Sequence, residues 1–192
     1  AGRPAVFCRF TGCNLWSGKE EDRKTAVCSF CDTDFAGTDG TDGGVYETPN
    51  LLVQKIARYW PSSHGHRFVV CTGGEPLLQM DESLIDALHQ EGFEIGVETN
   101  GTIIAPPGID WICVSPKASV ELKQTNGDEL KLIYPQVGAV PEQYEKLNFQ
   151  HFSLQPMDGE NHDGATRLAL DYVLRHPLWR ISLQLHKILA VR

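Results

Sequence analysis

The sequence predicts an α/β fold in the form of an incomplete β/α barrel. Short apolar segments that read as strands alternate along the chain with segments that read as helices. Such alternation favours parallel strands joined by right-handed crossovers. Six or seven strands fit into the 192 residues, whereas a complete eight-stranded barrel needs about 250. We therefore expect a single domain over residues 1–192, a partial barrel in which some crossover helices are shortened or lost.

The predicted strands are short and apolar, and several of them run directly into glycine-rich or polar motifs. They cover residues 4–10, 68–71, 93–98, 109–114, 130–134, 149–154 and 181–185. Folds of this kind bind their ligands at the carboxyl ends of the strands. Functional side chains are therefore expected at these strand ends.

Three helices are indicated by the residues that begin or end them. Thr48 and Pro49 begin the first helix, with Thr as the cap and Pro at the first helical position. Asp81 caps the second. The third covers residues 165–174 and ends before Pro177. These helices supply crossovers between successive parallel strands.

Charge and hydropathy argue against two classes of partner. The formal net charge is −8 and no basic stretch stands out, whereas nucleic-acid binding needs a surplus of Lys and Arg. No apolar run approaches the length of a membrane span, and the amino end lacks a signal-peptide pattern. We expect a cytoplasmic protein that acts on a small molecule, without a nucleic-acid or membrane partner. Because the chain enters a strand almost directly after Ala1, we also expect that a native amino-terminal strand precedes it.

Residues 11–47 form a long predicted loop with little periodicity and much Gly, Asp and Thr. Loops of this length are usually functional or disordered. Two residues separate Cys28 from Cys31, so one tight turn can present both thiolates to one metal centre, and fourteen residues separate Cys13 from Cys28. Three thiolates on a cubane iron–sulfur cluster would leave one iron open to a small ligand. With Cys8 as a fourth ligand, the same spacing also suits structural zinc.

Cys8 fits the zinc site less well than the other three cysteines. It lies in the middle of a predicted strand, where the backbone does not curl around a metal. Cys71 and Cys113 lie in apolar strands and are most simply core thiols. On the cysteines alone, an iron–sulfur cluster and a zinc ion are both compatible with the spacing.

Four polar motifs follow predicted strands. They are residues 72–76 (Thr-Gly-Gly-Glu-Pro), 98–102 (Glu-Thr-Asn-Gly-Thr), 115–117 (Ser-Pro-Lys) and 155–159 (Gln-Pro-Met-Asp-Gly). The paired glycines allow close approach of the backbone to a ligand, and the carboxylate beside them can accept from an ammonium group. Each motif alone equally fits a plain turn. Four of them in series, after a loop with three cysteines, are hard to explain as independent turns.

Together these motifs resemble the radical S-adenosylmethionine superfamily and, within it, the family of 7-carboxy-7-deazaguanine synthases. The usual superfamily spacing of the cysteines is three residues and then two. The fourteen-residue gap here departs from that spacing and matches a subgroup of the synthase family. Residues 31–33 (Cys-Asp-Thr) and 186–187 (His-Lys) strengthen the likeness, which spans nearly the whole chain. The resemblance implies a partial barrel of the radical SAM type.

The resemblance also implies a [4Fe–4S] cluster and S-adenosylmethionine as cofactors. The implied cluster ligands are Cys13, Cys28 and Cys31. The implied cofactor contacts are Gly74 and Glu75 to the methionyl amine, Glu98, Asn100, Ser115 and Lys117 to ribose and carboxylate, and Gln155 and Asp158 on the adenosine side. One electron from a flavodoxin- or ferredoxin-type donor would cleave the sulfonium and yield a 5′-deoxyadenosyl radical.

The family's substrate is 6-carboxy-5,6,7,8-tetrahydropterin, which undergoes ring contraction with loss of ammonia to 7-carboxy-7-deazaguanine, a precursor of deazapurine nucleosides such as queuosine. The resemblance implies that Arg9 clamps the substrate carboxylate. Thr72 would bond the pterin, and His186 would reach it from the last strand. Thr33 would meet a magnesium ion, with Asp32 as its neighbour. A homodimer is also implied.

Two other functions are weighed against this one. An activating enzyme of the same superfamily would place a glycyl radical on a large protein partner, but Arg9, Thr72 and His186 favour a pterin. A zinc-stabilised binding module would hold no iron and would not turn over S-adenosylmethionine.

Overall fold

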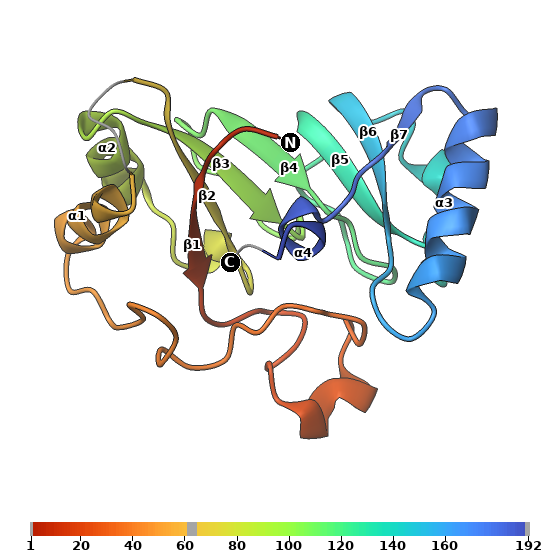
Figure 1. Cartoon of the computed structure of the whole chain (residues 1–192), viewed down its shortest axis with the longest axis horizontal. Coiled ribbons are helices and arrows are strands. Elements are labelled where there is room, and N and C mark those ends of the chain that lie inside the picture. The colour runs from red at the N-terminus through yellow and green to blue at the C-terminus, as the bar shows by residue number, and fades with distance from the viewer. Residues whose placement is uncertain (1, 61–64, 191–192) are drawn as a thin grey trace.

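One sheet of seven parallel strands organises the molecule (Figure 1). The computed structural model describes residues 2–60 and 65–190. The strands are β1 (Val6–Phe10), β2 (Arg67–Gly73), β3 (Phe93–Thr99), β4 (Trp111–Val114), β5 (Asn126–Tyr134), β6 (Asn148–Pro156) and β7 (Trp179–Ile181). They lie side by side in chain order, and each neighbouring pair is parallel. The predicted incomplete β/α barrel is therefore confirmed.

Helices form some of the crossovers and are missing from others. They are α1 (Pro49–Arg58), α2 (Glu82–Gln90), α3 (His162–Arg175) and the short α4 (Leu185–Ile188). Figure 1 shows α1 and α2 beside the first strands and α3 at the opposite end of the sheet. Within residues 2–60 and 65–190, the connections after β3, β4 and β5 contain no α-helix. The expectation that crossover helices are lost is met in this central part of the sheet.

The core lies between the helices and the outer face of the sheet, in two clusters. In the first, Val69 of β2 and Ile95 of β3 pack with Leu88 of α2, and none of the three has exposed surface. In the second, Leu132 of β5 packs with Ala169 of α3. The two clusters stabilise the two ends of the sheet and fix which face of each strand points outward.

The opposite, inner face of the sheet carries the polar residues. Cys71 and Val97 belong to the core beneath α1 and α2. Because side chains alternate between the faces of a strand, the residues that follow them, Thr72 and Glu98, point to the inner face. Arg9 pairs in register with Thr72 and shares that face. The sheet thus gathers several predicted site residues on one surface.

The prediction is wrong at the carboxyl end of the chain, where residues 181–185 are not a strand. The last strand is Trp179–Ile181, and Leu185–Ile188 form the helix α4. Trp179 packs into the core at 3% exposure, whereas the alternating apolar residues that suggested the strand are at least 37% exposed. His186 consequently lies on α4 and not on the last strand.

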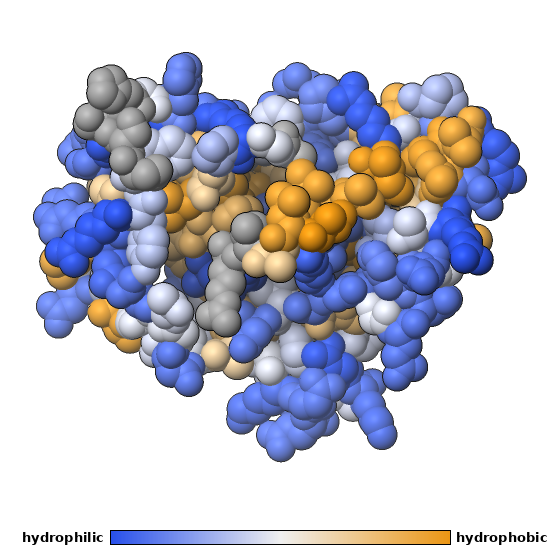
Figure 2. Space-filling view, viewed as in Figure 1, coloured by the Kyte–Doolittle hydropathy of each residue, from blue (hydrophilic) through white to orange (hydrophobic). Residues whose placement is uncertain are grey.

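An apolar band is exposed over β7 and α4 (Figure 2). It consists of Leu178, Ile181, Leu183, Leu185, Ile188 and Leu189. Apolar side chains gathered in this way mark contact surfaces more often than isolated ones do. In the part of the chain that the structure describes, no helix is both long enough and apolar enough to cross a bilayer.

Removal of the α2 cap should weaken the fold. Asp81 Oδ1 accepts the Leu84 amide at 2.9 Å, so Asp81→Ala should lower the free energy of unfolding by about 1 kcal/mol. Hydrogen bonds from Ser83 and Leu84 lower the pKa of Asp81. The cap should therefore contribute fully above about pH 4, the ordinary range for Asp, and be lost as the pH falls through the lowered value. Urea denaturation at several pH values measures this.

The matched control is Asp86→Ala, at an exposed aspartate on the same helix. It should change the unfolding free energy by less than half as much. Equal losses in the two variants would show that the cap contributes nothing.

Candidate active site

The paired glycines after β2 hold the start of the cysteine loop. Gly74 donates its amide to the Phe10 carbonyl at 2.9 Å, and Glu75 donates to the Gly12 carbonyl at 2.8 Å. A Cβ on Gly74 would lie 1.9 Å from the Gly12 oxygen, so no other residue fits. The close approach that the glycines allow is thus made by the chain's own loop.

The Glu75 carboxylate is buried beneath this contact, with no exposed surface. One oxygen accepts from the Thr99 hydroxyl at 2.8 Å and the Leu77 amide at 3.1 Å, and the other accepts from the Asn100 amide at 2.8 Å. Burial raises the pKa of Glu75, and these hydrogen bonds oppose the rise. These contacts fix the end of β3. The predicted contact of Glu75 with a methionyl amine stays a prediction.

Asn100, at the end of β3, contacts the first cysteine. Its side-chain nitrogen donates to Asn14 Oδ1 at 3.0 Å and lies 4.0 Å from Cys13 Sγ. Its side-chain oxygen accepts from the amide and hydroxyl of Thr102. The Gly74–Glu75 turn and the end of β3 therefore position Cys13 from two sides.

The second and third cysteines form a turn whose thiols interact. A hydrogen bond from Cys28 lowers the pKa of Cys31 to about 6, and the same interaction together with burial raises the pKa of Cys28. The charge of Cys13 also acts on Cys28, which places the three thiols near one another. Cys31 Sγ lies 3.9 Å from the Thr33 carbonyl oxygen.

Lys117 brings a cation to these thiols from the end of β4. Its ammonium donates to the Ser115 carbonyl at 2.6 Å and to the Ser115 hydroxyl at 2.7 Å. Burial lowers the pKa of Lys117, and the negative charges of Cys28 and Cys31 counter that effect. The sequence analysis predicts that residues 115 and 117 belong to the same site as the cysteines. The effect of the cysteine charges on Lys117 supports this assignment, which stays a prediction.

The donor set fits an iron–sulfur cluster better than a zinc ion. Cys8 lies in β1 and hydrogen-bonds Cys71 of β2, so it is held within the core and away from the loop thiols. Among the described residues, no three His, Cys, Asp or Glu side chains converge on one metal ion. A cluster takes each thiolate on a different iron, so it suits three soft ligands that lie near one another without converging on a single ion.

The inner face holds a partly buried ion pair that the sequence reasoning missed. Lys131 of β5 donates to Glu98 of β3 across the intervening strand β4. The Lys131 side chain is 14% exposed and that of Glu98 is 33% exposed. A lysine between two core leucines, Leu130 and Leu132, was the available signal, because such a residue must find a partner on the opposite face.

Lys187, which the sequence analysis used only as part of the family likeness, joins three distant segments. Its ammonium lies 2.6 Å from a carboxylate oxygen of Asp32 in the loop and 2.6 Å from one of Asp158 after β6. Gln184 also donates to Asp32 at 2.8 Å. Burial alone would raise the pKa of Asp32, but the bonds from Lys187 and Gln184 lower it. Both carboxylates, expected at magnesium and at the cofactor, are thus engaged by α4.

The remaining predicted site residues lie on different elements of the fold. Arg9 is exposed on the inner face beside Thr72, and Gln155 is half-buried near the end of β6. His186 is exposed on α4. Their roles toward a ligand stay predictions.

Comparison with known proteins shows which families this chain resembles in sequence and in fold. The sequence model of the Radical SAM superfamily matches residues 23–128. A 7-carboxy-7-deazaguanine synthase of Bradyrhizobium diazoefficiens is 62% identical over 192 residues, which are 100% of this chain and 91% of that protein. One of Burkholderia multivorans is 58% identical over 191 residues, with the same coverage. The crystal structure of QueE from Escherichia coli has a TM-score of 0.64 at 25% identity and covers 95% of this chain and 86% of that one.

A sequentially ordered parallel sheet with a three-cysteine loop at its carboxyl edge, together with the superfamily match, defines a radical SAM protein. Within that superfamily, the chain belongs to the family of 7-carboxy-7-deazaguanine synthases.

The Glu75 carboxylate should be essential to the arrangement. Glu75→Gln replaces one acceptor oxygen with a donor that faces the donors Thr99, Leu77 or Asn100. We expect the free energy of unfolding to fall by about 1–3 kcal/mol, measured by chemical denaturation. Glu121→Gln, at an exposed glutamate, should leave it nearly unchanged. An equally stable Glu75→Gln protein would contradict the positioning role.

Lys187 should hold α4 on the loop. In Lys187→Met, the amides of Leu185–Ile188 should exchange faster with deuterium, measured by mass spectrometry. Global stability should change little, because the pairs are partly exposed and such pairs contribute about 0–1 kcal/mol. Lys146→Met, at an exposed lysine, is the control. Unchanged exchange in α4 would show that the ion pairs do not anchor it.

Proposed function

We propose that this chain is a lyase that converts 6-carboxy-5,6,7,8-tetrahydropterin to 7-carboxy-7-deazaguanine and ammonia, in deazapurine (queuosine) biosynthesis. The observation that carries the proposal is the meeting of the three-cysteine loop with the ends of β2, β3 and β4. Asn100 contacts Cys13 there, and the charge of Lys117 acts on Cys28 and Cys31. The chain's membership of the synthase family gives this site its reaction.

The loop thiols of Cys13, Cys28 and Cys31 would hold a [4Fe–4S] cluster. When bound, the cluster and S-adenosylmethionine supply radical chemistry. The protein's part is to hold the substrate in the correct orientation and to exclude water. Lys117, just after β4, and Glu98, on the neighbouring strand β3, would offer a cation and an acceptor for the carboxylate and ribose of the cofactor. The Gly74 backbone lies beside the loop that carries Cys13.

The inner face offers groups for a pterin carboxylate. Arg9 is exposed there beside Thr72, and no other residue type provides such a planar pair of donors for a carboxylate. His186 approaches from α4, which Lys187 ties to the loop. Thr33 follows Cys31 and offers oxygen atoms to a magnesium ion.

The proposal also includes the location, the oligomeric state and the electron donor of this single catalytic domain. We propose a cytoplasmic homodimer that receives electrons from a flavodoxin- or ferredoxin-type protein. The exposed apolar band over β7 and α4 supports a contact between protein copies. The net charge of −8 supports a small-molecule substrate over nucleic acid.

The test is an anaerobic assay of the protein reconstituted with iron and sulfide. With reductant, magnesium, S-adenosylmethionine and the tetrahydropterin, we expect 7-carboxy-7-deazaguanine, detected by mass spectrometry. Cys28→Ala should abolish product, because one cluster ligand is lost. Cys71→Ala, at a buried cysteine in the core, should keep its iron and its activity. Omission of magnesium should lower turnover in the wild type but have less effect in Thr33→Ala.

Two outcomes would change the proposal. Cleavage of S-adenosylmethionine without the deazaguanine would keep the superfamily chemistry and replace the substrate. A colourless protein with stoichiometric zinc would overturn the function altogether.

A further inference from the structure

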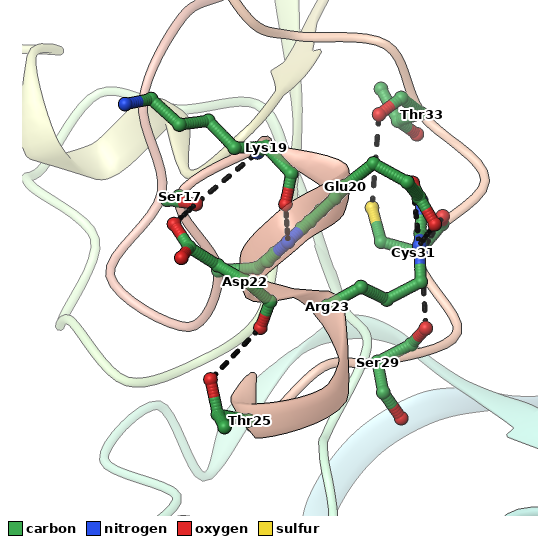
Figure 3. A network of polar contacts seen from close by, with 10 residues as sticks. Ser17, Lys19, Glu20, Asp22, Arg23, Thr25, Ser29, Cys31 and Thr33 are labelled. Carbon is green, nitrogen blue, oxygen red and sulfur yellow. Dashed lines mark hydrogen bonds and ion pairs between the residues drawn. The ribbon is translucent and has the colours of Figure 1, made fainter.

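Arg23 holds the turn that carries Cys28 and Cys31. It lies on the 3-10 helix Glu20–Thr25, inside the fourteen-residue segment that separates the first two cysteines. One guanidinium nitrogen donates to the Ser29 carbonyl at 3.0 Å and to the Cys31 carbonyl at 2.9 Å (Figure 3). The side chain therefore bonds the backbone at the third cysteine and between the second and the third.

The guanidinium is itself fixed from two other directions. Its Nε donates to both carboxylate oxygens of Glu20, at 2.7 and 2.8 Å. Its carbon lies 4.1 Å from the centre of the Trp16 ring. Trp16 is 7% exposed and packs edge-on against Phe35. A planar group that stacks on an aromatic ring while it donates in its own plane matches Arg and not Lys.

The position of Arg23 also brings charge to the thiols. Hydrogen bonds to Glu20 raise the pKa of Arg23, and negative charge on Cys31 and Cys28 adds to the rise. The Glu20 side chain is 77% exposed, whereas that of Arg23 is 29% exposed. Water therefore screens the Glu20 carboxylate more than the Arg23 guanidinium, so the charge of Arg23 adds a positive contribution at the two sulfurs.

We propose that Arg23 is a positioning residue for the iron–sulfur cluster, which orients the Cys28–Cys31 turn through two carbonyls and makes the cluster easier to reduce. This inference rests on the proposed function, because it requires that the three thiols bind a cluster. The proposal also assigns a structural role to the fourteen-residue segment between Cys13 and Cys28. The segment folds into a short helix whose arginine reaches back to the turn, so the cysteine turn is organised by the loop that precedes it.

Three variants of the reconstituted protein separate geometry from charge. Arg23→Met should release iron to a chelator about 10-fold faster or more, as loss of an outer partner of a metal ligand does. Its cluster potential, from a titration followed by electron paramagnetic resonance, should be more negative. Arg23→Lys should also lose iron faster but keep a potential near that of the wild type. Glu20→Gln should retain iron and have a more positive potential.

Arg167→Met, at an exposed arginine of α3, is the control and should match the wild type in both measurements. Iron release and potential in Arg23→Met equal to those of the wild type would overturn the inference. If Arg23→Met does not fold, Arg23→Lys and Glu20→Gln decide the matter, and wild-type values in both would overturn it equally. A wild-type protein that binds no cluster would instead refute the proposed function.

Discussion

The buried carboxylate of Glu75 is the interaction on which the site depends. Its backbone amide is bonded to Gly12 at the start of the loop, and its side chain is bonded to Thr99 and Asn100 at the end of β3. A carboxylate without exposed surface is costly to bury unless its acceptor positions are filled. Because the Glu75 backbone is bonded to the loop and its side chain to the end of β3, this one residue couples the two segments. Asn100 carries this constraint on to Cys13.

The cysteine loop is organised by contacts at each of its functional parts. Glycines at the end of β2 fix its start, Arg23 holds the turn in its middle, and Lys187 attaches Asp32 to α4. These contacts differ in kind, since Arg23 stacks on a buried ring whereas Lys187 makes ion pairs that are partly exposed. A metal centre on a loop needs such outer contacts, because the backbone of an irregular segment does not orient its ligands unaided.

The inner face of the sheet combines exposed and buried charges. Arg9 is exposed on it, whereas Glu98 and Lys131 are paired across β4. This contact orders the Lys131 and Glu98 side chains relative to each other. Among the described residues, Glu98 and Lys131 are thus engaged with each other, whereas no side-chain partner is seen for Arg9.

The sequence by itself determined the order of the elements, the outer core and the edge at which the site lies. Apolar alternation and caps such as Asp81 act over a few residues, so they can be read locally. The tertiary structure decided the partners of charged side chains and the course of the chain after β7. Lys187 meets Asp32 across 155 positions, and Lys131 meets Glu98 across a strand. Such pairs depend on which strand ends lie together in space, and no local pattern specifies that.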